Sequence, residues 1–215
     1  MIIIRPNTSD AFIVKENFED KIYLKHINLT EDDIWLDCGA NIGAFTLSIF
    51  DKVKEVISYE PERKNFRMLT ENIDLNDCSN VYISEKAIIS TDSKTVDFYE
   101  NLGNNKGQHS ILKGKNQQKI NVHATNINKV IKRFKINKIK MDVEGAEYEL
   151  IKNIEDWTPI KEIIFEYHFD NIGKNCEKKY NEVIQILKDN NFKVRYKKQV
   201  KQTKFWVTIV YGVKK

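Results

Sequence analysis

The feature that most constrains the fold is a short glycine-bearing run directly after an apolar segment. Residues 34–38 read Ile-Trp-Leu-Asp-Cys, and residues 37–43 read Asp-Cys-Gly-Ala-Asn-Ile-Gly. Glycine ends a strand and permits a tight turn in which the backbone closely approaches a ligand or a neighbouring helix. Residues 43–50 are apolar almost all round, which is typical of a packed helix. The run therefore predicts a strand, a tight loop and a helix in that order.

Strand and helix patterns alternate along the rest of the chain. The clearest amphipathic helix covers residues 180–187, where apolar side chains recur at i, i+3, i+4 and i+7. This alternation predicts an α/β fold with a mostly parallel sheet, helices on both faces, and an antiparallel pair at the C-terminal end. We expect strands at residues 34–38, 56–59, 81–84, 139–141, 163–167, 192–196 and 206–210, and helices at 43–50, 61–77, 127–134, 145–154 and 180–187.

Two parts of the chain are less regular. Residues 95–99 and 120–124 alternate between apolar and polar, and we expect them to pair as neighbouring strands. The polar segment 101–110 between them has the composition of a flexible loop that closes over a substrate. The opening residues, 1–6, are interpreted as an early strand, because their apolar run is too short for a signal peptide.

Length and composition indicate one domain. The 215 residues contain no Pro/Gly/Ser-rich divider, so we expect a single domain over 1–215, with an N-terminal extension at 1–32 and a Rossmann-like core at 33–215. The chain is 41% hydrophobic and 31% charged, and no apolar run is long enough to cross a bilayer, so no membrane partner is expected. Its three cysteines are widely spaced, which favours a cytoplasmic location over a disulfide framework.

The charge distribution is mildly basic, with a formal net charge of +4. Much of the local excess lies near the C-terminal end, in Lys193, Arg195, Lys197, Lys198, Lys201 and Lys204. A solvated, lysine-rich strand edge is favoured over a nucleic-acid footprint, although RNA stays an alternative partner.

Glu60 strengthens the interpretation of the glycine run as part of a cofactor site, because it ends the next expected strand about twenty residues on. A carboxylate there accepts hydrogen bonds from both hydroxyls of a ribose. The run lacks the G-x-G-x-x-G pattern that binds a pyrophosphate, so a methyl donor is favoured over NAD. A purely structural role for the two glycines, with Asp37 as a helix cap, leaves Glu60 unexplained. The expected cofactor-binding residues are Asp37, Gly39, Ala40, Asn41, Ile42, Gly43, Glu60, Ala87 and Asp142.

The segment 139–147, Ile-Lys-Met-Asp-Val-Glu-Gly-Ala-Glu, resembles the hallmark "lKiDvEGaE" of the FkbM-type methyltransferase family. Residues 35–43 resemble that family's "vDvGAniG" motif, and the likeness extends from Asp33 to His168. It implies a class I methyltransferase fold with a seven-stranded sheet and S-adenosylmethionine as methyl donor. It also implies O-methylation of a hydroxyl on a sugar, a glycan or a small metabolite. Asn126 stands where the family has an acidic residue, and the acceptor itself does not carry over.

Candidate catalytic residues follow two strands that we expect to be adjacent. His168 is predicted as general base, with Asp142 and Glu144 as orienting carboxylates. Simpler readings are a strand-end histidine without catalytic duty and, for Glu144 and Glu147, charges that complement a helix N-terminus. Glu166 is alternatively the ion-pair partner of a lysine. No metal ligands are predicted, but a Mg²⁺-like divalent cation shared by these carboxylates stays an alternative. His109 and Ser110 lie in the polar loop, and Ser110 resembles a serine that the family has in such a loop.

Two other functions compete with O-methylation. An RNA methyltransferase is one, because the basic C-terminal region also offers Tyr196, Phe205 and Trp206 for base stacking. A non-catalytic, methyltransferase-like binding subunit is the other. The presence of both Asp37 and Glu60 at the expected cofactor site argues against such loss of activity.

Overall fold

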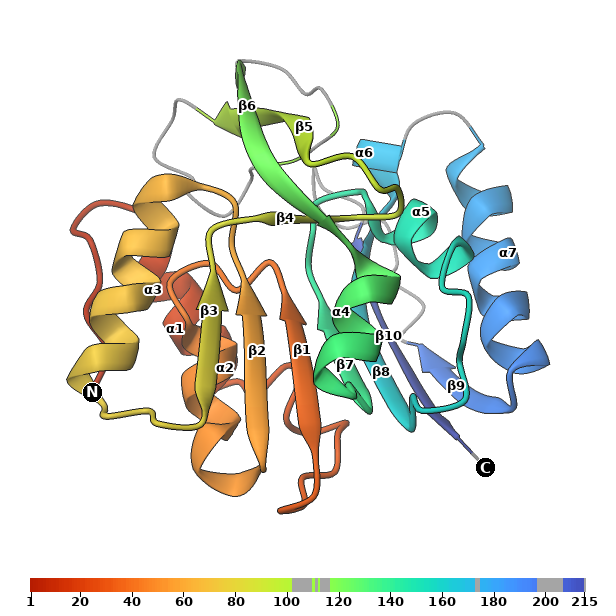
Figure 1. Cartoon of the computed structure of the whole chain (residues 1–215), viewed down its shortest axis with the longest axis horizontal. Coiled ribbons are helices and arrows are strands. Elements are labelled where there is room, and N and C mark those ends of the chain that lie inside the picture. The colour runs from red at the N-terminus through yellow and green to blue at the C-terminus, as the bar shows by residue number, and fades with distance from the viewer. Residues whose placement is uncertain (102–109, 111, 113–116, 173–174, 197–206, 215) are drawn as a thin grey trace.

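The computed structural model describes residues 1–101, 110, 112, 117–172, 175–196 and 207–214. Within them, seven strands form one sheet in the order β3-β2-β1-β7-β8-β10-β9 (Figure 1). All neighbours pair in parallel except β10, which is antiparallel to both β8 and β9. This confirms the predicted Rossmann-like sheet with an antiparallel C-terminal strand. The strands are β1 (Ile34–Cys38), β2 (Glu55–Tyr59), β3 (Val81–Ser84), β7 (Lys138–Met141), β8 (Glu162–His168), β9 (Phe192–Tyr196) and β10 (Val207–Lys214).

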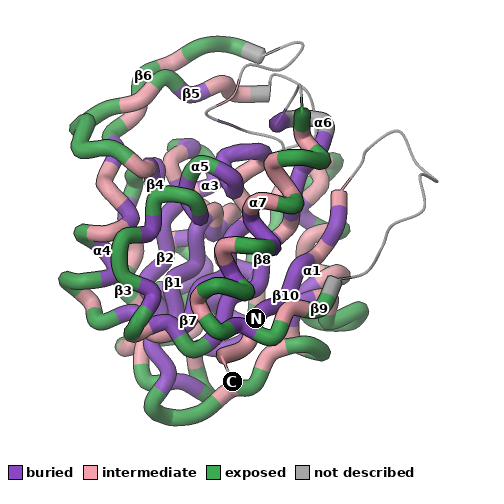
Figure 2. The backbone as a smooth tube through the Cα atoms, turned by 90° about the vertical axis from the view of Figure 1, so that its right-hand side faces the viewer, coloured by how far each residue is buried: buried purple, intermediate pink, exposed green. Residues whose placement is uncertain are grey.

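Helices cover both faces of this sheet, because its strands are apolar on both sides. Leu36 of β1 packs in the large core cluster beneath α4, α5 and α7, whereas its neighbour Trp35 packs against Phe45 of α2 on the other face. Figure 2 shows the buried strand residues between the two helix layers. Among the described helices, none has the length and apolar character needed to cross a membrane. The helices are α1 (Asp10–Phe18), α2 (Ala44–Ile49), η1 (Phe50–Lys52), α3 (Arg63–Leu75), α4 (Ile127–Phe134), α5 (Glu147–Lys152), α6 (Phe169–Ile172) and α7 (Cys176–Asp189).

A second, three-stranded sheet lies beyond the carboxyl ends of the main strands (Figure 1). Its order is β4-β6-β5, formed by β4 (Ala87–Ile89), β5 (Thr95–Asn101) and β6 (Gln117–Asn126). The antiparallel pairing of β5 with β6 confirms the predicted neighbours. The three-residue strand β4 was not predicted. Of the predicted polar loop, residues 102–109 lie outside the described part, and Ser110 pairs with Tyr99.

The N-terminal segment corrects one prediction, since residues 1–5 do not form a strand. The side-chain amides of Asn72 in α3 and of Asn76 just after this helix hold them instead. The backbone N–H of Ile3 donates to Asn72 Oδ1 over 2.6 Å, and the Met1 amino group donates to Asn76 Oδ1 over 2.8 Å. These amides satisfy the backbone that a neighbouring strand would otherwise pair with. Further along, Tyr23 is 3% exposed within the cluster of Trp35 and Phe45, so the extension contributes to the core.

Candidate functional site

An open pocket of about 570 Å³ lies at the carboxyl ends of β1, β2 and β7. The strand order reverses between β1 and β7, and ligands of open α/β sheets bind at such a point. Six predicted site residues line the pocket: Gly39, Asn41, Glu60, Ala87, Asp142 and Glu144. The other lining residues are Tyr59, Pro61, Asn65, Ile88, Phe98, Val143 and Ala146.

Gly39 and Gly43 fix the shape of the loop after β1. Gly39 has φ +78°, and a Cβ built there would lie 1.9 Å from the backbone oxygen of Asp142. Gly43 has φ +91°, and its Cβ would lie 2.7 Å from Leu69 Cδ1. L side chains rarely adopt such φ values, and no side chain fits against a fixed backbone oxygen at that distance. Glycine at both positions therefore lets the loop pass directly over the end of β7.

Asp37 faces the protein interior and does not line the pocket. Its carboxylate is fully buried, accepts a hydrogen bond from Thr46 Oγ1 over 2.8 Å and pairs with Lys140 Nζ at 3.0 Å. Lys140 also donates to the backbone oxygen of Gly39 over 2.9 Å. Burial by itself lowers the pKa of Lys140, but the charges of Asp37 and Asp142 together with the hydrogen bond to Asp37 outweigh it, so this pKa is raised. The pair ties β1, β7 and the glycine loop together. Ala40, Ile42 and Gly43 likewise lie outside the pocket lining.

Removing one partner of this buried pair should strongly destabilise the protein. Lys140→Met leaves the Asp37 carboxylate buried without a counter-charge, which costs about 3–5 kcal/mol. The matched control is Lys52→Met, because Lys52 pairs with Asp51 on the surface, where both side chains are more than half exposed. That exposed pair is worth less than about 1 kcal/mol. Urea unfolding of both variants measures the difference, and equal losses would contradict the structural role of Lys140.

Glu60 is 5% exposed at the end of β2, and backbone N–H groups hold both of its oxygens. Asn41 N–H donates to Oε2 and Glu62 N–H donates to Oε1, each over 2.8 Å. Burial raises the pKa of Glu60 to about 7, against the lowering effect of these two hydrogen bonds. A carboxylate has about four acceptor sites, so each oxygen can accept a further bond from a ligand. Nearby, the buried Asn41 Oδ1 has no hydrogen-bond partner among the described residues.

The raised pKa of Glu60 predicts a pH-dependent stability. The native state holds the proton more tightly than the unfolded chain, so the contribution is full below pH 4.5 and lost as pH rises to about 7. A shift of this size corresponds to about 3 kcal/mol. The stability deficit of Glu60→Gln relative to the parent protein should therefore shrink by that amount between pH 4.5 and 8. Urea unfolding across this range measures it, with exposed Glu71→Gln as control, and a constant deficit would contradict the prediction.

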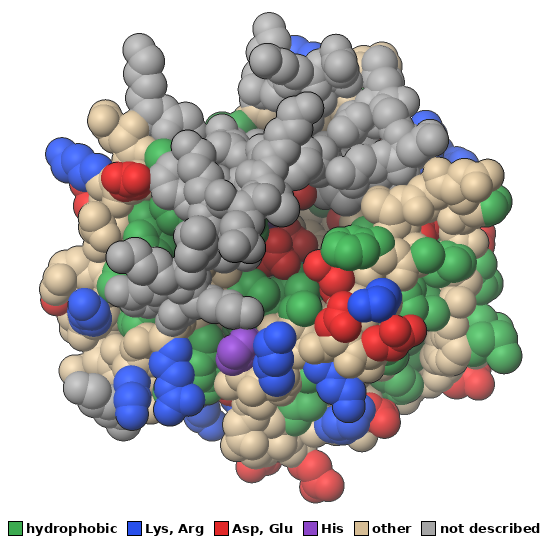
Figure 3. Space-filling view, turned by 180° about the vertical axis from the view of Figure 1, so that it is seen from behind, with side chains coloured by type: hydrophobic (Ala, Val, Ile, Leu, Met, Phe, Trp, Pro, Cys, Tyr) green, Lys and Arg blue, Asp and Glu red, His purple; other side chains and the backbone are tan. Residues whose placement is uncertain are grey.

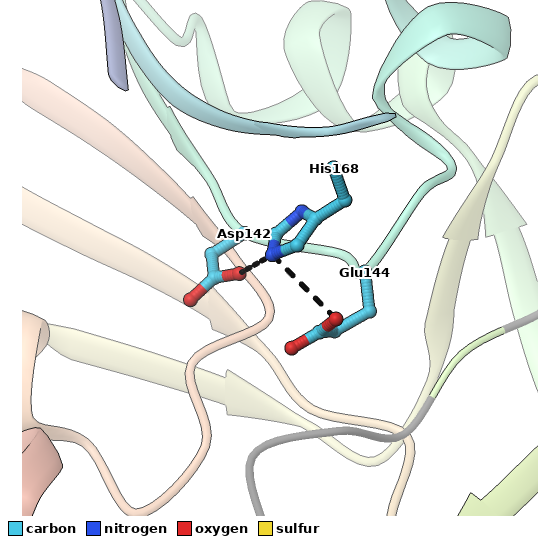
Figure 4. A group of neighbouring side chains, drawn as sticks. All are labelled: Asp142, Glu144 and His168. Carbon is cyan, nitrogen blue, oxygen red and sulfur yellow. Dashed lines mark ion pairs between the residues drawn. The ribbon is translucent and has the colours of Figure 1, made fainter. Parts of the chain in front are cut away.

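His168 converges with carboxylates at the rim, as the adjacency of the strands predicted (Figure 4). Its Nδ1 lies 2.9 Å from Glu147 Oε1, at hydrogen-bond distance. Its Nε2 faces Glu144 Oε2 at 3.5 Å and Asp142 Oδ1 at 3.8 Å. Glu166 Oε2 also lies 3.8 Å from Nε2. Asp142 and Glu144 follow β7, and His168 ends β8, so the group is assembled by the pairing of these two strands.

The contacts of Glu147 and Glu166 test the simpler interpretations given for these two residues. Glu147 opens α5, and its Oε1 accepts bonds from the N–H groups of Val143 and Gly145, so it holds the loop that leads into this helix. Glu166 accepts a 2.6 Å hydrogen bond from the hydroxyl of Tyr23, so its hydrogen-bond partner is a tyrosine and not the lysine of the alternative interpretation. Glu147 therefore combines a structural duty with the orientation of His168.

Sequence reasoning missed Tyr23 and Glu16. The Tyr23 hydroxyl links Glu166 to Asp142 Oδ2, which lies 3.5 Å away. Burial, with the added charges of Glu166 and Asp142, raises the pKa of Glu16 to about 7. Both residues belong to the N-terminal segment, whose sequence has no pattern that indicates a site.

Figure 3 shows acidic side chains in a hollow on the face opposite to the view of Figure 1.

The charges of this rim influence one another. Burial raises the pKa of Glu166 to about 7, with a further rise from the charge of Asp142. Burial by itself lowers the pKa of His168, but Glu144 and Glu147 raise it well above its ordinary value. His168 therefore holds a proton more tightly than a free imidazole does, which makes it a weaker candidate for the proton acceptor. Glu166 has the pKa of an effective proton acceptor near neutral pH.

Comparisons with known proteins extend this picture. The methyltransferase FkbM domain matches residues 37–194. "Methyltransferase sdnD" of Sordaria araneosa is 25% identical, covering 72% of this chain and 73% of that protein. Methyltransferase FkbM from Methylobacillus flagellatus KT has a TM-score of 0.58 and 15% identity, over 93% of this chain and 47% of that one. An rRNA methylase from Streptococcus thermophilus has a TM-score of 0.55 and 10% identity, over 100% of this chain and 99% of that one. These two structural likenesses show a shared fold.

Proposed function

The chain belongs to the methyltransferase family that carries the FkbM domain, and on this premise we propose that it methylates a hydroxyl oxygen with S-adenosylmethionine as donor. The acceptor class is a sugar, a glycan or a small metabolite. The observation that carries the proposal is the position of the pocket at the strand-order reversal, with Glu60 on one side and the Asp142 and Glu144 rim on the other.

Support for the donor comes from the chemistry of the pocket. Glu60 has acceptor capacity for the two ribose hydroxyls, and Asn41 Oδ1 offers another acceptor. Ala87, Ile88 and Phe98 give the pocket an apolar wall suited to the flat face of an adenine.

Methyl transfer from a sulfonium needs alignment and one proton acceptor. The acceptor oxygen forms a bond to the methyl carbon, and the carbon–sulfur bond breaks with its electron pair remaining on sulfur. The hydroxyl proton passes to a side chain of the rim. We assign that role to Glu166 in place of the predicted His168, because its carboxylate lies at the rim, is 18% exposed at its side chain and is oriented by the Tyr23 hydroxyl; its pKa of about 7 supports the assignment. Asp142, which lines the pocket and approaches the Tyr23 hydroxyl that binds Glu166, would hold the acceptor.

Donor binding is tested first. Glu60→Gln replaces one acceptor oxygen by an amide group, so S-adenosylmethionine binding should weaken about 10- to 100-fold through loss of charge-assisted hydrogen bonds. Titration calorimetry measures the affinity, with Glu71→Gln as control. Gly39 variants are less informative, because even a Cβ there collides with Asp142. Unchanged affinity in Glu60→Gln would remove this pocket as the donor site.

The acceptor and the base are tested with a methyl-labelled donor offered to glycans, small alcohols and RNA. We expect label on a hydroxyl oxygen of the first two classes. With such an acceptor, Glu166→Gln should lower turnover about a hundredfold while donor affinity stays unchanged. Exposed Glu149→Gln is the control. Label on RNA alone would favour the RNA alternative, and donor binding without transfer to any acceptor would favour a binding subunit.

A further inference from the structure

We propose that Asp142, Glu144 and His168 bind a divalent cation of the Mn²⁺ class beside the methyl-donor pocket. One ligand atom from each lies within 4.8 Å of the other two. The three come from the loop after β7 and the end of β8, both fixed by the main sheet (Figure 4). Binding of the ion is independent of the methyl-transfer chemistry, and only its use in that reaction rests on the function proposed above.

The distances favour a shared ion over direct hydrogen bonds. His168 Nε2 lies 3.5 Å from Glu144 and 3.8 Å from Asp142, whereas a charge-assisted N–H to carboxylate bond measures roughly 2.7–2.9 Å. Atoms that ligate one ion at roughly 2.0–2.2 Å stand roughly 3 to 4.3 Å apart. The two Nε2 distances fall within that interval. The other ring nitrogen behaves differently, because Nδ1 makes an ordinary 2.9 Å contact with Glu147.

The orientation of His168 is the second, independent observation. Its side chain is only 8% exposed, and Nε2 points between the carboxylates of Glu144, Asp142 and Glu166 at 3.5–3.8 Å, within ion-pair distance but longer than a direct charge-assisted hydrogen bond. Metal-binding histidines commonly use one ring nitrogen for a carboxylate that fixes the ring, and present the other to the ion. Glu147 fixes the ring here, and backbone N–H groups of Val143 and Gly145 hold Glu147 in turn.

The ligand set also indicates which ion fits. Carboxylates suit Mg²⁺ and Mn²⁺, and an imidazole favours transition metals, so a set of two carboxylates and one imidazole matches Mn²⁺. Asp142 and Glu144 line the donor pocket as well. An acceptor hydroxyl that coordinates the ion would therefore lie next to the methyl group, and the positive charge would favour loss of the hydroxyl proton.

The test uses the full chain, freed of metal with EDTA and titrated with MnCl₂ in a calorimeter. We expect one ion per chain, and at least tenfold weaker binding in both Asp142→Asn and His168→Ala. Glu149→Gln, an exposed carboxylate on α5, is the matched control and should bind like the parent. Pulsed electron paramagnetic resonance of bound Mn²⁺ should show coupling to an imidazole nitrogen, which disappears in His168→Ala.

Absence of binding at millimolar Mn²⁺, or binding that both variants leave unchanged, would overturn the proposal. Asp142→Asn alone decides the matter if His168→Ala does not fold, since Asp142 is 32% exposed at its side chain and tolerates replacement more readily. Calorimetry of S-adenosylmethionine in EDTA separates the two proposals. Donor binding and transfer without any metal site would sustain the proposed function and remove the ion.

Discussion

The buried ion pair between Asp37 and Lys140 is the interaction on which the site depends. It joins β1 to β7 at the point where the strand order reverses, and Lys140 also holds the backbone oxygen of Gly39. With the loop fixed there, the backbone of Gly39 passes against that of Asp142, and any Cβ would separate them. The pocket and the acidic rim thus share one rigid border. Asp37, expected to face the ligand, instead positions the residues that do.

The carboxylates of the rim illustrate how this border brings distant segments together. Asp142 and Glu144 follow β7, Glu166 and His168 end β8, and Tyr23 reaches the group from the N-terminal segment. Burying several acids close together is unfavourable unless they are protonated, hydrogen-bonded or paired with a cation. The protein uses the Tyr23 hydroxyl, the Glu147 contact and raised pKa values for this purpose. Strongly perturbed pKa values gathered at one rim are typical of functional sites.

Much of this architecture could be predicted from sequence, because local hydrophobic periodicity determines where its strands and helices lie. The main strands and helices follow apolar runs and helical spacing, and residues at strand ends must meet along one edge of a parallel sheet. That reasoning brought His168, Asp142 and Glu144 together correctly. The same reasoning failed where long-range packing determines the position of a segment or side chain. Tyr23 and Glu16 occupy a segment without periodicity, β4 is only three residues long, and the opening residues pair with the Asn72 and Asn76 side chains. The inward direction of Asp37 depends on Lys140, about a hundred residues away.

The central claim is that the loop after β1 and the end of β2 together bind the methyl donor. Hydrogen exchange of backbone amides, with and without S-adenosylmethionine, tests it most directly. We expect slower exchange in the donor complex over residues 39–43 and 60–62, where the Asn41 and Glu62 amides already hold Glu60. Donor binding that leaves these amides unchanged and protects another part of the chain would contradict it.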